Sequence, residues 1–172
     1  MGDRLGELSP CMQGYVTLVR NDLARMGIDT EILYTGRDRG EFGLTMVNGA
    51  TKAKSFGDSF HSQKPLTAPP AEEGLYKALA FDLGIPQTRS AVTGAVRRYN
   101  WEDPRYKVFG QVAGKYGLTW GGRFKSICDM GHIQGPRIAR PGPEHWAMTP
   151  EQLDAWCRKE IEENRRLLAL AS

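Results

Sequence analysis

The sequence has no run of about 18 apolar residues, the length that a membrane-spanning helix needs. Its first residues, 1–6, also lack the apolar stretch that forms the centre of a signal peptide. Both absences predict a protein that is synthesised in the cytoplasm and has no membrane span. If such a protein acts outside the cytoplasm, something else must release it.

Cysteine is scarce and shows no motif spacing. Cys11, Cys128 and Cys157 are odd in number and form no Cys-x-x-Cys pair. This pattern argues against a disulfide framework and against a zinc site made of thiolates. We therefore expect three free thiols.

Positive charge is too sparse to indicate nucleic-acid binding. The chain has 23 Lys and Arg against 20 Asp and Glu, a formal net charge of +3, and no basic run. A weak positive charge is compatible with mild attraction to anionic polymers such as those of bacterial cell walls. We expect no nucleic-acid partner.

The length of 172 residues and a hydrophobic content of 40% predict one domain, residues 1–172, that can bury a core. Helical periodicity and capping residues mark three helices, and short apolar runs mark strands between them. The predicted helices span 9–26, 103–116 and about 149–169; the predicted strands span 28–35, 78–83, 118–120 and 127–134. We expect loops at 36–58 and 62–77, and 84–100 shows no clear pattern. Helices at both ends of a set of short strands predict an α+β fold.

The segment 120–132 carries the clearest chemical signal, because it ends in Asp129-x-x-His132. Upstream, His61 follows a polar segment, and Asp82 ends an apolar run where a buried carboxylate is costly unless it is paired or bound to metal. Three protein ligands, one open position and a nearby carboxylate make up a hydrolytic zinc site. Each of these residues on its own also fits an ordinary structural role, so the spacing leaves both interpretations open.

Taken in order, these elements resemble a family of cell-wall peptidases. The family comprises zinc D-Ala-D-Ala carboxypeptidases and L-alanyl-D-glutamate peptidases of the hedgehog/D,D-peptidase superfamily, and it includes many phage endolysins. The resemblance covers roughly residues 9–134. The matching positions are Tyr34 to Arg37, Ser59 with His61, Ala80 with Asp82, Gly117 to Gly122, and Asp129 with His132.

One spacing departs from the family. The family usually has about six residues between the first histidine and the aspartate, whereas this chain has twenty, 62–81. We interpret the difference as a proline-containing insertion in a surface loop. Glu72 or Glu73 within it would replace Asp82 as the third ligand if Asp82 were not one.

The resemblance implies a small antiparallel sheet that carries a zinc site and is flanked by helices, with the core in 9–134 and a C-terminal helix at about 149–169. His61, Asp82 and His132 would bind Zn²⁺, and Asp129 would be the general base. Arg37 would stabilise the oxyanion or hold a substrate carboxylate, although a solvated loop charge is the alternative. Ser59 and Trp120 would contact substrate, with Trp120 packing beneath the site. His145 lies beyond the motifs and is expected not to be a ligand.

The implied activity is hydrolysis of the L-Ala–D-Glu bond in the stem peptide of peptidoglycan, by a monomeric phage endolysin that lyses its host. The run from Trp120 through Ser126 is most similar to endolysin members. A D-Ala-D-Ala carboxypeptidase is the alternative within the family. A non-catalytic binding protein or a phage structural protein with this fold is the alternative from another class.

Overall fold

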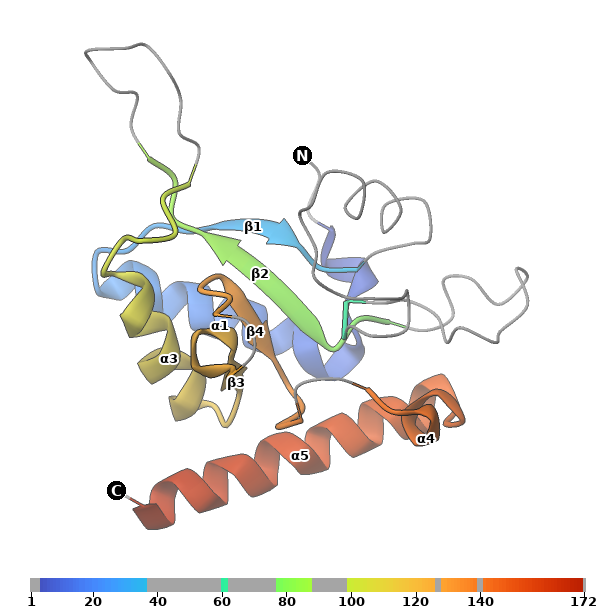
Figure 1. Ribbon diagram of the computed structural model, residues 1–172. Helices are drawn as coiled ribbons and strands as arrows, with labels where there is room; N and C mark the ends of the chain where they lie inside the picture. Colours follow the sequence, from blue (N-terminus) through green and yellow to red (C-terminus); the bar gives the residue numbers. More distant parts are fainter. Residues whose placement is uncertain are drawn as a thin grey trace.

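The computed structural model describes residues 4–36, 60–61, 77–87, 99–125, 128–138 and 141–171. Within these residues, helices and a four-stranded antiparallel sheet form an α+β arrangement, as predicted (Figure 1). The helical elements are η1 (Arg4–Glu7), α1 (Pro10–Arg25), α3 (Tyr106–Lys115), η3 (Gly121–Arg123), α4 (Pro143–Trp146) and α5 (Pro150–Ala171). No helix among the described residues is both long and apolar enough to cross a membrane.

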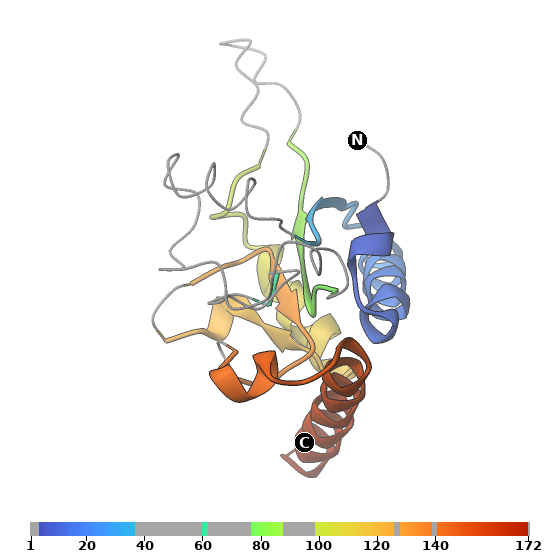
Figure 2. The ribbon, with the colours of Figure 1, turned by 90° about the vertical axis from the view of Figure 1, so that its right-hand side faces the viewer.

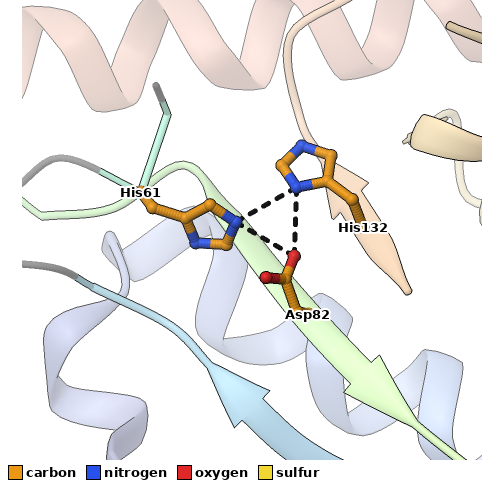
Figure 3. A group of neighbouring side chains, drawn as sticks. All are labelled: His61, Asp82 and His132. Atoms are coloured by element: carbon orange, nitrogen blue, oxygen red, sulfur yellow. Dashed lines mark hydrogen bonds and ion pairs between the residues drawn. The ribbon is translucent and has the colours of Figure 1, made fainter. Parts of the chain in front are cut away.

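The sheet has the strand order β1-β2-β4-β3, and every neighbouring pair is antiparallel. Its strands are β1 (Glu31–Tyr34), β2 (Ala80–Gly84), β3 (Thr119–Trp120) and β4 (His132–Gln134). The register of the two central strands places Asp82 directly opposite His132 (Figure 3). Side chains alternate between the faces of a strand. Asp82 therefore lies on the opposite face of β2 from Phe81 and Leu83.

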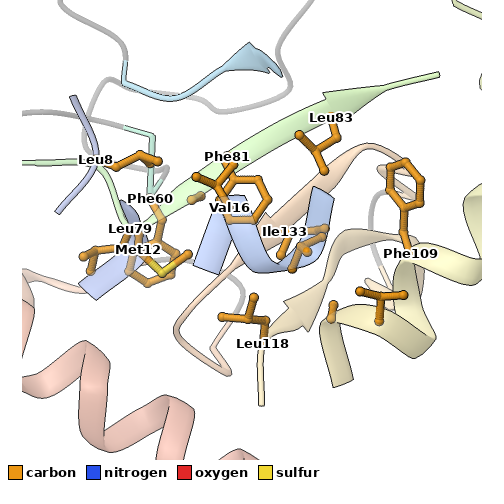
Figure 4. Packing of buried hydrophobic residues seen from close by; sticks show 14 of the residues in the cluster. Leu8, Met12, Val16, Phe60, Leu79, Phe81, Leu83, Phe109, Leu118 and Ile133 are labelled. Carbon is orange, nitrogen blue, oxygen red and sulfur yellow. The ribbon is translucent and has the colours of Figure 1, made fainter. Parts of the chain in front are cut away.

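The apolar face of the sheet forms the core. Phe81 and Leu83 of β2 and Ile133 of β4 lie together with Val16 of α1 and Phe109 of α3 (Figure 4). These five side chains are all at most 1% exposed. α5 runs along one edge of the molecule in both views and contacts α1 and α3 (Figures 1 and 2). Its residues Leu153, Cys157 and Ile161 complete the core.

The C-terminal ends of α1 and α3 and the start of α5 agree closely with those expected from sequence. α1 and α3 both end next to a glycine with positive φ, Gly27 and Gly117, as their sequences indicate. The predicted capping box of α5 is confirmed: Gln152 N–H donates to Thr149 Oγ1 at 3.3 Å, and Thr149 N–H donates to Gln152 Oε1 at 2.9 Å. Leu168 fits the apolar spacing of this helix but is 37% exposed, so the buried stripe of α5 does not extend to it.

Three predicted boundaries were wrong. α3 begins at Tyr106 rather than at 103, because the Asp103 carboxylate accepts the Arg105 N–H and guanidinium and holds a separate turn. β1 is shorter than 28–35, and β4 is shorter than 127–134. Asp129 donates its N–H to the carbonyl of Gly121 in η3, so Asp129 lies beside η3 rather than on an extended strand.

Candidate metal centre

Three buried side chains converge above the polar face of the two central strands. The Nε2 atom of His61, the Oδ1 atom of Asp82 and the Nδ1 atom of His132 form a triangle whose sides are all 3.0 Å (Figure 3). We call these residues the ligand triad. They are the three residues that the sequence motifs predicted as metal ligands, and they are positioned to bind a metal ion.

The sheet and one backbone hydrogen bond bring the triad together. Asp82 and His132 come from paired positions on β2 and β4. His61 belongs to a short segment that is joined to the chain entering β2, because Leu79 N–H donates to the carbonyl of Phe60 at 2.8 Å. Positions 61, 82 and 132 are far apart in sequence, so the folded sheet rather than local sequence creates the site.

Hydrogen bonds on the outer side of each imidazole fix its orientation. Nδ1–H of His61 donates to the carbonyl oxygen of Thr35 at 2.8 Å. Nε2–H of His132 donates to Oε1 of Gln134 at 2.9 Å. The amide nitrogen of Gln134 donates to the carbonyls of Pro136 and Ile138, at 2.8 and 2.6 Å, which leaves its oxygen to face His132.

These contacts determine the tautomers. A neutral imidazole carries one N–H, and both outer partners are acceptors, so the proton of each ring lies on its outer nitrogen. Each ring then presents a lone pair to the centre of the triangle, where the Asp82 carboxylate adds another. An acceptor on the outer nitrogen is the usual support of a metal-ligating histidine.

The dimensions and donor types of the triad suit a small divalent cation. In a tetrahedral zinc site with bonds of about 2.0–2.1 Å, ligand atoms lie about 3.3 Å apart, close to the 3.0 Å sides of the triangle. Two imidazole nitrogens and one carboxylate oxygen form a ligand set found in such sites. Three protein ligands leave a tetrahedral ion one further position.

The charges in the triad also favour a cation at its centre. Burial raises the pKa of Asp82. When the imidazoles carry a second proton, on the nitrogens that face Asp82, the positive charge of His61 and the hydrogen bonds from both rings outweigh burial and hold that pKa well below its usual range. Burial likewise opposes protonation of His132, yet its hydrogen bond and charge interaction with Asp82 raise its pKa. The site therefore stabilises positive charge, which is supplied by a proton or by a metal ion.

Asp129 lies beside the triad but is itself exposed to solvent. Its pKa is raised, first because the surrounding protein removes part of its hydration and second because the negative charge of Asp82 acts on it. The positive charges of His132 and His61 and the N–H of Gly131 act in the opposite direction. Since water reaches the side chain, its desolvation is smaller than that of Asp82. A carboxylate with a raised pKa beside a candidate metal site is a suitable group for proton transfer.

Gly121 allows this close arrangement. A Cβ atom at this position would lie 2.7 Å from the Asp129 carbonyl oxygen and 2.8 Å from Cβ of His132. The first glycine of the Trp-Gly-Gly motif is thus required by packing of η3 against the segment that carries Asp129 and His132.

Two aromatic residues border the segment that carries Asp129 and His132. Trp120 is half-buried, and its indole N–H donates to the carbonyl of Met130 at 2.9 Å, so it supports the chain between Asp129 and His132. The ring centroid of Phe124 lies 5.6 Å from that of His132. Sequence reasoning gave no role to Phe124, Thr35 or Gln134; the only signal was that Gln134 lies two residues after a ligand on the same strand.

Other predicted residues either lie elsewhere or fall outside the described residues. Arg37, Ser59 and the fallback ligands Glu72 and Glu73 are outside the described ranges, as are loop segments 41–58 and 62–76. His145 is buried but does not belong to the triad: its Nδ1 accepts the Gly142 N–H at 2.8 Å, and the centroid of its ring lies 4.4 Å from that of Trp156. The expectation of free thiols is confirmed, with Cys11 and Cys157 buried and Cys128 exposed.

No protein-family model matches the chain, and no curated protein matches its sequence. The functional conclusion therefore rests on the geometry of the triad and on the order of its motifs.

Proposed function

We propose that this protein is a zinc-dependent peptidase that cuts the peptide stems of peptidoglycan, with a fold of the hedgehog/D,D-peptidase type. The observation that carries the proposal is the meeting of His61 Nε2, Asp82 Oδ1 and His132 Nδ1 beside the carboxylate of Asp129. Such a site combines a place for a Lewis acid with a group that can move a proton, which is what amide hydrolysis needs.

The chain's own residues account for binding and proton transfer. His61, Asp82 and His132 would hold the ion, and a bound zinc ion supplies Lewis acidity to water and to a substrate carbonyl. Asp129 accepts a proton from the attacking water as the new C–O bond forms. It then delivers that proton to the amine nitrogen as the C–N bond breaks. The pKa of Asp129 is raised by partial desolvation and by the charge of Asp82, which makes its carboxylate a better proton acceptor than a free aspartate.

The substrate-contacting roles follow from the motif resemblance. Arg37 would stabilise the oxyanion that develops during attack or hold a substrate carboxylate. Ser59 would donate a hydrogen bond to substrate. Trp120 would border the substrate, in addition to supporting the segment beneath it through its bond to Met130.

We place the cut at the L-Ala–D-Glu bond and propose that the protein acts as a monomeric phage endolysin. The run Trp120-Gly121-Gly122 followed by Phe124-Lys125-Ser126 supports this choice because it is most similar to endolysin members. Such an enzyme would reach the cell wall through a separate pore. A D-Ala-D-Ala carboxypeptidase would instead release only the terminal D-alanine.

Digestion of purified peptidoglycan followed by mass spectrometry of the products tests the proposal. We expect new N-terminal D-glutamyl stem fragments from the wild type and no products from His132→Ala. Asp129→Asn should retain zinc and lose roughly 10²- to 10⁴-fold in turnover, the usual contribution of a general base. Asp29→Asn, at an exposed position in another part of the chain, is the control and should remain active. Zinc-loaded wild type that binds peptidoglycan and releases no fragment would identify a binding protein and refute the peptidase.

A further inference from the structure

Glu7, at the end of η1, reaches the segment that follows β1. Its Oε2 accepts the hydroxyl of Thr35 at 2.6 Å and the N–H of Gly36 at 3.1 Å. Thr35 is fully buried, and Gly36 is also buried. One carboxylate oxygen therefore holds two consecutive residues in place from a helical turn 28 positions earlier in the chain.

Thr35 in turn orients a member of the ligand triad. Its carbonyl accepts Nδ1–H of His61 at 2.8 Å, the hydrogen bond that leaves Nε2 of His61 facing Asp82 and His132. If Thr35 rotates, this acceptor moves away from the ring, and the proton of His61 is no longer held on Nδ1. The carboxylate of Glu7 thus acts on the ligand through one intervening residue.

The backbone at Glu7 and Ser9 is hydrogen-bonded to the chain that leads to Asp82, a second member of the ligand triad. The carbonyl of Glu7 accepts the Ala78 N–H at 2.9 Å, and Ser9 N–H donates to the Ala78 carbonyl at 2.9 Å. Two residues further on, Ala80 begins β2, the strand that carries Asp82. Glu7 therefore contacts both the segment that orients His61 and the segment that delivers Asp82.

We infer that Glu7 is a positioning residue of the metal centre, which fixes the Thr35 carbonyl against His61 so that His61 Nε2 is presented to the ion. This inference rests on the proposed metal site but not on the peptidase activity. A carboxylate suits the position because one of its oxygens accepts hydrogen bonds from the buried Thr35 hydroxyl and the buried Gly36 N–H. An apolar side chain would not accept these two hydrogen bonds. Gly36 also directly precedes Arg37, so the same contact holds the chain next to that predicted catalytic residue.

Zinc affinity, measured by competition with a chromophoric chelator, tests the inference. Glu7→Ala should weaken zinc binding by about 10- to 100-fold, the usual effect of removing a group that orients a ligand. Glu7→Gln keeps an oxygen acceptor and should stay within about threefold of wild type. Glu31→Ala is the matched control, because Glu31 is an exposed carboxylate on neighbouring β1 that accepts the Tyr99 hydroxyl instead.

Thr35→Val provides a second test if Glu7→Ala fails to fold. It removes the hydroxyl that donates to Glu7 while retaining the side-chain shape and the carbonyl that accepts from His61. It should also weaken zinc binding, by less than Glu7→Ala. Long-range ¹H–¹⁵N spectra of the histidine rings provide a readout that a general loss of stability would not change. In wild type Nδ1 of His61 should carry the proton, and in Glu7→Ala the two tautomers should mix.

The outcomes separate this inference from the proposed function. Folded Glu7→Ala that binds zinc within about threefold of wild type, with unchanged His61 nitrogen shifts, would overturn the positioning role. Wild type that binds zinc and fails to cut peptidoglycan would refute the peptidase and leave the role of Glu7 intact. Wild type that binds no zinc would overturn both.

Discussion

Asp82 and His132 lie opposite each other on β2 and β4, and Oδ1 of Asp82 is 3.0 Å from Nδ1 of His132. This contact depends on the register of the two strands, because a shift of either strand by one residue would turn its side chain in the triad toward the apolar core. Phe81 and Ile133, which are also paired and fully buried, hold the register from the other face. The packing of the core therefore fixes the geometry of the metal centre.

Gln134 should be essential for tight metal binding although it is not a ligand. Gln134→Leu removes the acceptor of His132 Nε2–H and the bonds to two carbonyls, so the ring loses its fixed tautomer. We expect zinc affinity to fall by about 10- to 100-fold in a chelator-competition assay. Gln111→Leu, at an exposed position of α3, is the control, and an equal loss in both variants would contradict a role for Gln134.

The close approach at Gly121 should make this position intolerant of any side chain. Gly121→Ala places a Cβ against the Asp129 carbonyl and against His132, so the segment must move. We expect a loss of about 1–3 kcal/mol in the free energy of unfolding, as is usual for overpacking, together with weaker zinc binding.

Gly14→Ala is the matched control, because Gly14 lies on the exposed side of α1 and a Cβ there meets no atom within 4 Å. It should stabilise the protein by about 0.5–1 kcal/mol in urea unfolding, since alanine favours a helix more than glycine does. Unchanged stability and zinc affinity in Gly121→Ala would contradict the packing described here.

Removal of the metal should destabilise the protein. A metal ion that binds only the folded protein stabilises it, by about 2.7 kcal/mol when the free ion is at 100 times its Kd. EDTA removes the ion and therefore this stabilisation. We expect EDTA to lower the Tm of wild type and excess zinc to restore it. The Tm of His61→Ala should respond to neither addition. A wild-type Tm that is independent of zinc would argue against the site.

Acid should weaken the contact between α1 and α3. Asp22, buried on α1, accepts Lys115 Nζ at 2.5 Å and the Tyr116 hydroxyl at 2.8 Å. These bonds, chiefly the one from Lys115, lower the pKa of Asp22 from 3.8 to about 2. Because the pKa is lower in the folded state, the stabilisation is complete above about pH 4 and is lost as the pH falls toward 2.

Urea unfolding between pH 2 and 6 measures this contribution. Wild-type stability should fall more steeply below pH 4 than that of Asp22→Asn, which has no carboxylate to protonate. Lys115→Met, which removes the first partner of Asp22, should also flatten the decline. Equal slopes in all three proteins would show that Asp22 does not couple folding to pH.

Apolar spacing and capping residues predicted the helices because both signals depend on residues within one or two helical turns of each other. Apolar spacing places Met12, Val16 and Val19 on one buried face of α1, and the Thr149–Gln152 capping box marks the start of α5. Met26 shows the limit of periodicity: it follows the same spacing but is 59% exposed, because α1 ends at the preceding residue.

The three residues of the triad were predictable because their types and their order form motifs. The groups that orient them were not predictable. The Thr35 carbonyl is a backbone group and leaves no trace in the sequence. Glu7 reaches Thr35 only after η1 folds against the segment that follows β1. The turn at Asp129 was mistaken for strand. The bond from Asp129 N–H to the Gly121 carbonyl and the turn closed by His132 N–H on the Asp129 carbonyl interrupt a run whose residue types favour a strand.

The most direct test of the metal centre is the zinc content of purified protein after equilibrium dialysis, for wild type and for alanine variants at His61, Asp82 and His132. We predict one zinc ion per wild-type chain and a large loss of binding in each variant. Wild type without zinc, or His132→Ala with a full equivalent of tightly bound zinc, would contradict the account.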